Sequence, residues 1–144
     1  MRIVVQRTRN AKVEVNEKTV GQSEKGLTLL VCMEKNDNVQ TIKKAAQKIL
    51  AARIFEDENE KMNLNILQVG GTILAVSQFT LSWRGDKGNR PSFDLSMSPD
   101  MANDMFEQFC ALLREQIPVE TGEFGASMEV SLTNMGPVTF IFDF

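Results

Sequence analysis

Histidine is absent from this chain of 144 residues, and cysteine occurs only twice. Histidine is the side chain that most often serves as a general base near neutral pH, so any reaction carried out here must proceed without it. Cys32 and Cys110 lie in separate apolar segments, with no second cysteine nearby and no obvious cationic partner in either segment. The sequence therefore predicts two buried structural thiols, and neither a zinc site nor a catalytic cysteine.

Long apolar runs are also missing. No segment approaches the roughly 18 apolar residues that would cross a membrane, and the opening "MRIVVQRTRN" lacks the apolar core of a signal peptide. We therefore expect a cytoplasmic protein with no membrane contact. With 42% apolar and 24% charged residues, the composition is that of an ordinary globular protein, and its length predicts a single domain over residues 1–144.

The net charge of −3 provides no overall field that would attract nucleic acid. Such a contact would need a local basic patch, and the sequence offers two. One is the loop "WRGDKGNRPSF" (residues 83–93), which carries Arg84, Lys87 and Arg90, and the other is a helical face with Lys43, Lys44 and Lys48. A solvated surface is the simpler interpretation of each patch, because helix exteriors normally carry scattered lysines.

The pattern of apolar residues predicts both strands and helices. Strands are expected over "RIVVQR" (2–7) and "AKVEVN" (11–16), paired with each other, over the central "GLTLLVCM" (26–33), and over "GGTILAVSQFTL" (70–81). Residues 128–132 alternate, and "TNMGP" then turns the chain into "VTFIF" (138–142), which is typical of a hairpin.

Two helices are expected between these strands. One follows the cap Asp37 and continues to Leu50, and the other opens with Ser98 as cap and Pro99 at its first position and stops before Pro118. The fold class is therefore α/β (mixed α+β): one domain with two helices packed on a largely antiparallel, mixed or barrel-like sheet.

Motifs that bind nucleotides or metals are missing. The chain contains no "GxxxxGK", "GxGxxG", "HExxH" or "GxSxG". The acidic "FEDENEK" (55–61) lacks the ligand spacing of a calcium loop and is better interpreted as a charged turn. We therefore expect neither a metal nor a cofactor.

Two short stretches place unusual requirements on the local backbone. They are "SQFTL" (77–81), after an apolar strand, and "NMGPVT" (134–139), at a turn. Where a strand ends at a pocket, its last N–H groups lose their ladder partners and can form an oxyanion hole, with Ser77, Gln78 and Thr80 adding polar side chains. A Gly-Pro bond can adopt the cis form at low cost, and glycine leaves the approach open. An ordinary strand end and an ordinary turn remain the alternative.

The pair of stretches resembles the signature of the D-aminoacyl-tRNA deacylases, the D-Tyr-tRNA deacylase family. The opening "MRIVVQR" and the segments "ARIFEDENEKMNL", "GNRPSF" and "VETGEFGASMEVSL" are also similar to family segments and occur in family order, so the resemblance spans the chain. It implies a hydrolase that cleaves D-aminoacyl-tRNA, and also glycine mischarged on tRNA for alanine, without metal or cofactor. It also implies a homodimer.

The resemblance assigns roles to particular residues. Gly136 and Pro137 would form a cis peptide that reaches into the pocket of the other subunit and blocks an L side chain, which amounts to chiral proofreading. Arg7 would hold the Gly-Pro carbonyls, and Met128 would pack near that motif. Arg7 could otherwise be an ordinary strand end, and Met128 could be a core residue.

The resemblance implies catalysis by Ser77, Gln78, Phe79 and Thr80 in one of two ways. Thr80 is the nucleophile, or the 2′-hydroxyl of the RNA assists the attack while N–H groups near Phe79 and Thr80 hold the oxyanion. We favour the second, because the sequence shows no base that would activate a threonine hydroxyl.

The chain departs from the family pattern in "SWRGDKGNR", where Asn89 replaces a residue that is often basic, so tRNA affinity or its salt dependence can differ. A different class of function stays open, a catalytically inactive dimeric module of the same fold that binds tRNA or another nucleic acid.

Overall fold

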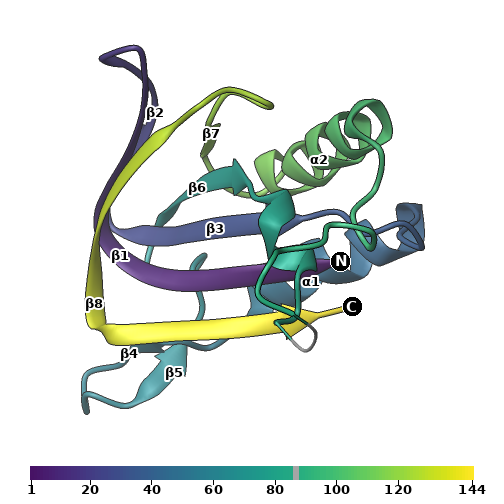
Figure 1. Cartoon of the computed structure of the whole chain (residues 1–144). Coiled ribbons are helices and arrows are strands. Elements are labelled where there is room, and N and C mark those ends of the chain that lie inside the picture. The colour runs from purple at the N-terminus through teal and green to yellow at the C-terminus, as the bar shows by residue number, and fades with distance from the viewer. Residues whose placement is uncertain (86–87) are drawn as a thin grey trace.

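The computed structural model describes residues 1–85 and 88–144 and is built around a strongly curved sheet (Figure 1). The strands of this sheet are β1 (Arg2–Val15), β2 (Lys18–Ser23), β3 (Gly26–Cys32), β6 (Thr72–Ser77), β7 (Val119–Thr121) and β8 (Glu129–Asp143). A separate small pair is formed by β4 (Phe55–Glu56) and β5 (Met62–Leu64), and the helices are α1 (Val39–Ala51), the 3-10 helix η1 (Phe79–Ser82) and α2 (Pro99–Arg114). Lys87 of the basic loop lies outside the described residues.

The sheet is mixed. β1 pairs antiparallel with β2, β3 and β8, whereas β3 with β6 and β6 with β7 pair in parallel. β3 lies between β1 and β6 and is almost entirely buried, which confirms the predicted central strand. The single α+β domain with two helices predicted from the sequence is therefore the observed architecture.

The predicted pairing of residues 2–7 with 11–16 is wrong, because both stretches belong to one continuous strand, β1. The chain turns at Asn16 and Glu17 instead, whose φ angles of 50° and 63° are those of a tight hairpin turn, and β2 then pairs with the second half of β1. Both central residues of this turn have left-handed backbone angles, and asparagine adopts such angles more readily than most residues.

The predicted hairpin at "TNMGP" is also wrong. β8 is one strand of 15 residues, and both of its halves pair with β1, from Glu14 opposite Glu129 to Arg2 opposite Asp143. The Gly-Pro stretch bends β8 without reversing its direction. Together, β1 and β8 form a long bent ribbon at one side of the molecule (Figure 1).

Both predicted helices are present. α1 is capped by Asn38, whose side chain accepts from the N–H groups of Gln40 and Thr41. The predicted cap Asp37 is displaced by one residue, because its carboxylate turns back to accept from the Glu34 N–H at 2.6 Å. α2 starts at Pro99 as expected, although the Ser98 side chain makes no capping hydrogen bond.

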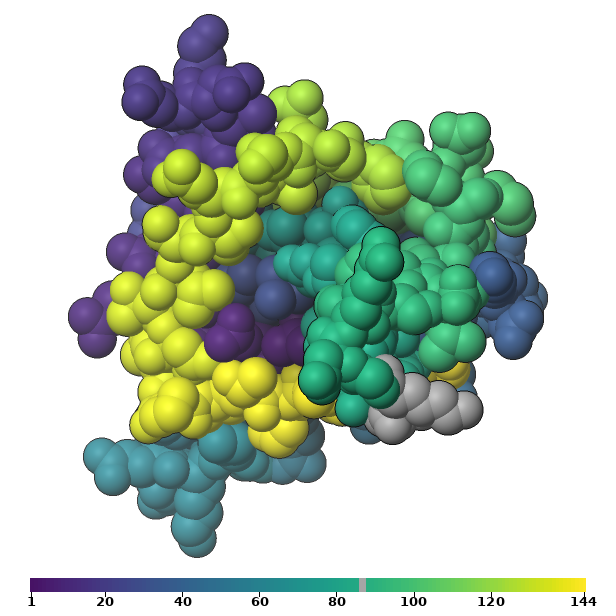
Figure 2. Space-filling view, viewed as in Figure 1, coloured from purple at the N-terminus to yellow at the C-terminus, as the bar shows by residue number. Residues whose placement is uncertain are grey.

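Each face of the sheet supports an apolar cluster. The larger cluster lies between the sheet and the two helices and includes Leu29 of β3, Ile49 of α1 and Phe109 of α2, each 0% exposed. The smaller cluster, built on Ala11, Val13, Leu74 and Val76, lies on the opposite, concave face. Figure 2 shows this concave face as a hollow framed by β8 and the segment after β6, with β1 and β3 at its floor.

The sheet nearly closes into a barrel where β2 approaches β7. The Gln22 N–H donates to a carboxylate oxygen of Glu120 at 3.4 Å. A Cβ atom at Gly21 would lie 2.2 Å from the Thr121 carbonyl oxygen, so only glycine allows this approach. The barrel-like sheet therefore depends on a small residue at the closing seam.

Both cysteines are free and buried, as predicted. Burial raises the pKa of the Cys32 thiol to about 11 and that of Cys110 to about 12, so both thiols stay protonated at neutral pH. No helix in the described part of the chain is long and apolar enough to cross a membrane.

Candidate functional site

The segment "SQFTL" lies where β6 ends. The β3–β6 ladder reaches its last pair at Val31 and Ser77, and the Gln78 N–H still donates to the Val31 carbonyl at 2.7 Å. η1 begins at the next residue, which corrects the predicted strand through residue 81. The N–H groups of Phe79 and Thr80 therefore lie in a first helical turn, where no preceding turn supplies acceptors.

The polar side chains of this segment bond with each other. The Gln78 amide donates to the Thr80 hydroxyl, and Thr80 is exposed to solvent. An amide group that donates in this way does not take up a proton. The hydrogen-bond partner of Thr80 therefore gives it no general base.

Phe79 is the most prominent apolar group of the segment, with 56% of its surface exposed. Its ring packs edge-on against Phe93, with centroids 4.9 Å apart, and its carbonyl oxygen accepts from the Cys32 thiol at 3.5 Å. These contacts fix η1 against the end of β3 and against the loop that follows η1.

A small pocket lies beside this segment. Its volume is about 70 Å³, well below the roughly 300–1,000 Å³ usual for ligand sites. The lining residues come from β3, the end of β6, α2 and the turn before β8: Val31, Met33, Ser77, Gln78, Phe79, Ser96, Ala102, Phe106, Phe124 and Gly125. Phe124 and Gly125 come from the distant "GEFGA" stretch (122–126) and are absent from the predicted site residues. Beside "SQFTL", the described part of a single chain thus has no pocket of the usual ligand-binding size.

The second motif forms a bulge in β8. Gln6 lies opposite Thr139 and Thr8 opposite Asn134, so residues 135–138 of β8 all face the single residue Arg7 of β1. We call residues 135–138 the Gly-Pro bulge. It contains the Gly136–Pro137 peptide bond in the cis form, and both residues are exposed.

Arg7 supports the Gly-Pro bulge from below. The residue is 6% exposed, and its side chain donates to the carbonyls of Met135 and Ile54, each at 3.1 Å, and to the Glu56 carboxylate at 2.9 Å. The fork of N–H donors on a guanidinium suits three acceptors in different directions. The structure therefore brings Arg7 and the bulge together within one chain, and it adds Glu56, which sequence analysis missed.

Asn134 holds the bulge from its other side and was also absent from the predicted site residues. Its side-chain oxygen accepts from the Val138 N–H at 2.7 Å, and its amide donates to the Thr139 hydroxyl at 2.9 Å. Asparagine forms such local bonds across turns more readily than most residues. Its position at the start of "NMGPVT" was the signal that could have identified it.

Within one chain, the two motifs lie apart. Arg7, beneath the bulge, pairs with Leu27 near the start of β3, whereas Ser77 pairs with Val31 near its end. The four intervening steps correspond to about 13 Å of strand. The structure thus places the predicted residues in two separate groups at opposite ends of β3.

Met128 belongs to neither group in one chain. It is half-buried and packs against the smaller apolar cluster, and a Cβ atom at Gly122 would lie 2.6 Å from its sulfur. These contacts fit a core residue. The predicted contact of Met128 with a Gly-Pro motif stays a prediction.

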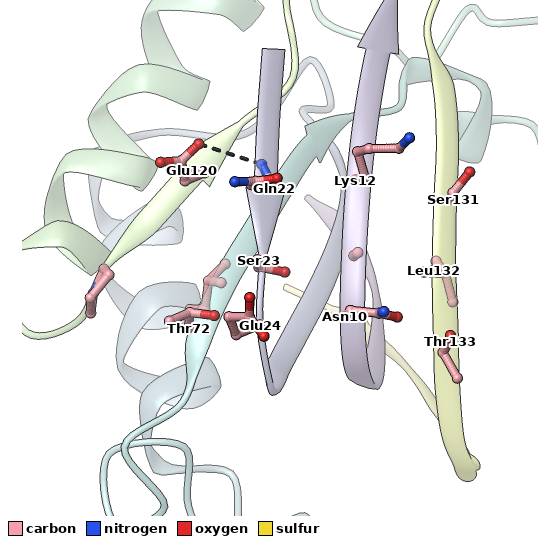
Figure 3. Close-up of a pocket in the computed structure, with 13 residues that line it drawn as sticks. Asn10, Lys12, Gln22, Ser23, Glu24, Thr72, Glu120, Ser131, Leu132 and Thr133 are labelled. Atoms are coloured by element: carbon pink, nitrogen blue, oxygen red, sulfur yellow. Dashed lines mark hydrogen bonds between the residues drawn. The ribbon is translucent and has the colours of Figure 1, made fainter. Parts of the chain in front are cut away.

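A wider groove of about 640 Å³ lies at the other end of β6, near Thr72 (Figure 3). Asn10, Lys12, Gln22, Glu24 and Glu120 give it polar walls, but it contains none of the predicted site residues. We therefore base the candidate site on the two motifs and not on the size of this groove. Among the described residues, no group of three or more acidic, cysteine or histidine side chains could hold a metal ion.

Comparison with known proteins identifies the family. The family model of D-Tyr-tRNA(Tyr) deacylase matches residues 4–143. The chain belongs to this family. This membership makes the protein a hydrolase, in agreement with the motif pair.

Individual relatives match this chain over nearly their full length. A protein of Thermosipho africanus named D-aminoacyl-tRNA deacylase is 53% identical over 99% of this chain and 97% of its own, and one of Haemophilus influenzae with the same name is 51% identical over 95% of each chain. Among solved structures, the c-Myc DNA Unwinding Element Binding Protein has a TM-score of 0.95 at 34% identity, covering 99% of this chain and 98% of its own.

A structure described as a probable eukaryotic D-amino acid tRNA deacylase has a TM-score of 0.83 at 19% identity, over 99% of this chain and 98% of its own, and shows the shared fold.

Proposed function

We propose that this hydrolase cleaves the ester that joins a D-amino acid to the 3′-terminal ribose of tRNA. Water adds to the ester carbonyl, the bond to the ribose oxygen breaks, and that oxygen takes up a proton. The products are a free D-amino acid and uncharged tRNA. We further propose that glycine mischarged on tRNA for alanine is a substrate, and that the protein works in the cytoplasm.

One observation carries this proposal. Both motifs are complete on a chain that matches the family model over residues 4–143, and Phe79, Thr80, Gly136 and Pro137 within them are exposed. Relatives about half identical to it over nearly their whole length are named D-aminoacyl-tRNA deacylase. A binding module without turnover would have no need to keep both motifs.

We propose that the working form is a homodimer in which the Gly-Pro bulge of each subunit completes the pocket of the other. Three features support this arrangement. The two motifs lie at opposite ends of β3, so one chain cannot join them. The pocket beside η1 is small, and Gly136 and Pro137 point to solvent with no role in their own chain's core.

The enzyme then selects D-aminoacyl-tRNA by excluding the L side chain from the pocket. With the amino group and ester held in the pocket, an L side chain would be directed at the partner's Gly136 and Pro137, while a D side chain would point away from them. Glycine has no side chain to reject. The same wall that excludes L-aminoacyl-tRNA therefore accepts the achiral substrate.

For catalysis, we propose that the N–H groups of Phe79 and Thr80 stabilise the oxyanion. An aminoacyl ester is already activated, so positioning and oxyanion stabilisation supply most of what the reaction needs. The 2′-hydroxyl of the terminal ribose assists the attack. Gln78 orients Thr80 by the hydrogen bond described above.

The direct test uses one tRNA charged separately with D-Tyr, L-Tyr and glycine, incubated with catalytic amounts of protein. We expect release of D-Tyr and glycine and survival of L-Tyr, since only the L side chain meets the bulge. Ester hydrolysis over time is the measurement, with buffer alone as the control. Release of none of the three faster than in buffer would refute the deacylase function, and equal release of D-Tyr and L-Tyr would refute the rejection model.

Thr80→Val separates the two mechanisms. If the backbone N–H groups carry the reaction, loss of the hydroxyl should lower kcat by no more than about ten-fold, the order of one neutral hydrogen bond. Thr80→Ser serves as the matched control because it keeps a hydroxyl. A loss in Thr80→Val of several orders of magnitude, with activity kept in Thr80→Ser, would instead identify Thr80 as the nucleophile.

A second candidate function is binding of nucleic acid without turnover. One observation favours it: the solved structure with 34% identity and a TM-score of 0.95 is named for binding a DNA unwinding element. The two functions differ in a simple assay. A binding module would retard uncharged tRNA or DNA in a gel and leave D-Tyr-tRNA intact, whereas the enzyme releases many amino acids per protein.

A further inference from the structure

Positive charge is concentrated on one of the two helices. α1 carries Lys43, Lys44 and Lys48 and contains no acidic residue. α2, which packs beside it on the same face of the sheet, carries three acidic residues, Asp100, Asp104 and Glu107, and its one basic residue, Arg114, lies 3.6 Å from Glu107. In a protein of net charge −3, α1 is therefore a local surface that attracts anions.

The three lysines of α1 are available to a partner. All are exposed, and none forms an ion pair with any other residue that the structure describes. Lys44 and Lys48 are four residues apart and therefore share one side of the helix. Helix formation alone does not require them, since glutamine would fill the same exposed positions at a similar helix propensity.

Lys44 and Lys48 line a shallow groove between α1 and the end of β8, which we call the α1–β8 groove. Gln47 and residues 141–144 complete it. Its one acidic residue, Asp143, is paired with Arg2 at 3.1 Å and with Arg84 at 3.7 Å. The charge of Asp143 is thus compensated, and Lys44 and Lys48 are the charged side chains of the groove that have no ion-pair partner among the described residues.

The α1–β8 groove is connected to the candidate site. The chain between β3 and α1 starts at Met33, which lines the pocket, and it is held by hydrogen bonds from Met97 to Met33 and from Lys35 to Leu95, each 3.0 Å. Arg84, two residues after η1, forms an ion pair with Glu34, which lies in this segment between β3 and α1. The segment that leads from β3 into α1 therefore begins at the wall of the pocket.

The spacing of the lysines matches a nucleic-acid strand. Lys44 and Lys48 are four residues apart, which is about 6 Å along the helix axis. Phosphates of one duplex strand follow one another at about 3.4 Å along the axis, so this distance corresponds to about two nucleotides. Two lysines that share one side of a helix can thus contact neighbouring phosphates of one strand.

We infer that Lys44 and Lys48 bind phosphates of the tRNA acceptor arm and position its 3′ end at the pocket. This inference rests on the proposed function for the identity of the RNA. It assigns the tRNA-binding role to the lysine face of α1 and not to α2, whose acidic residues would repel the phosphates.

The test is the double variant K44Q/K48Q, with K18Q/K61Q as matched control. Lys18 and Lys61 are exposed and unpaired within the described chain, and they adjoin the hairpin turn of β1 and β2 and that of β4 and β5. Their substitution changes the net charge by the same two units. The first measurement is the affinity for uncharged tRNA as a function of salt. For K44Q/K48Q we expect the slope of log K against log salt to fall by about two.

In this assay, the advantage of the wild type over K44Q/K48Q should shrink by about ten-fold between roughly 50 and 200 mM salt. K18Q/K61Q should retain the wild-type slope. Equal slopes for all three proteins, or an equal fall in both variants, would overturn the assignment of phosphate binding to α1.

The second measurement is hydrolysis. For K44Q/K48Q we expect a higher KM for D-aminoacyl-tRNA with kcat unchanged, and unchanged hydrolysis of D-aminoacyl-adenosine, which has no acceptor stem. A loss on both substrates would show that the lysines act on the site itself, and would refute the phosphate-binding role. A wild type that binds tRNA through Lys44 and Lys48 but hydrolyses neither substrate would refute the proposed function and leave this inference standing.

Discussion

Gly136→Ala should lower hydrolysis of D-Tyr-tRNA by about 100-fold or more, the order expected when a positioning element moves by about 1 Å. Gly136 has a φ of 130°, which L side chains rarely adopt, and a Cβ atom there would lie 2.7 Å from a methyl carbon of Val138 and 3.3 Å from Arg7. Because Arg7 is already fixed by three acceptors, the Gly-Pro bulge must move instead. The measurement is single-turnover hydrolysis.

Gly70→Ala is the matched control. Gly70 also has a left-handed φ, of 60°, but a Cβ atom there meets nothing within 4 Å. It should lose some stability and keep its activity. If Gly136→Ala hydrolyses D-Tyr-tRNA at the wild-type rate while its circular dichroism is unchanged, the bulge has no role in the site.

Mixing of two inactive variants tests whether the bulge acts across subunits. Phe79→Pro removes one proposed oxyanion donor and places proline at the first position of η1, where it is tolerated. In a heterodimer of Phe79→Pro with Gly136→Ala, one of the two sites combines an intact η1 with an intact bulge. Refolding the two together should recover up to about a quarter of the wild-type activity. No recovery would place the bulge and η1 of one subunit in the same site.

Arg7→Met should lower the free energy of unfolding by about 2–6 kcal/mol and impair hydrolysis as well. Methionine fills the volume of the arginine stem, but it leaves the carbonyls of Met135 and Ile54 without their donor. Each unsatisfied buried acceptor costs about 1–3 kcal/mol. The measurement is urea unfolding, in which the midpoint should fall while the dependence of the free energy on urea concentration stays unchanged.

Two variants control for charge and for general packing effects. Arg53 is exposed and makes one hydrogen bond, to the Asn63 carbonyl at 2.7 Å, so Arg53→Met should cost less than about 1 kcal/mol. Arg7→Lys keeps the charge but cannot reach three acceptors, and it should resemble Arg7→Met. A fully active and stable Arg7→Met would show that Asn134 alone holds the bulge.

Local patterns along the chain predicted the helices and the central strand well. Helix α2 was predicted from Pro99 and α1 to within one residue, because caps, proline and apolar spacing act over a few neighbouring residues. The cap of α1 was missed by that one residue, since Asp37 accepts from Glu34. This bond depends on how the chain folds back before the helix.

The errors concern strands whose pairing is decided over long distances. Residues 2–7 and 11–16 looked like two strands, and residues 128–142 looked like a hairpin. In the structure, β1 and β8 are each one continuous strand, because they pair with each other from Arg2 and Asp143 at one end to Glu14 and Glu129 at the other. Alternation of apolar residues gives the face of a strand and carries no information about its partner.

The candidate site shows the same division. The sequence by itself determined the motif residues, the absence of a histidine base, the two helices and the family resemblance, since all of these depend on residue identity and near neighbours. Only the tertiary structure decided that Arg7 and Glu56 support the Gly-Pro bulge, that this bulge and "SQFTL" lie at opposite ends of β3, and that Lys44 and Lys48 lie beside the end of β8. These are contacts between segments far apart in the chain, and they are fixed by the pairing of β1 with β3 and β8 and by the packing of α1 against the sheet.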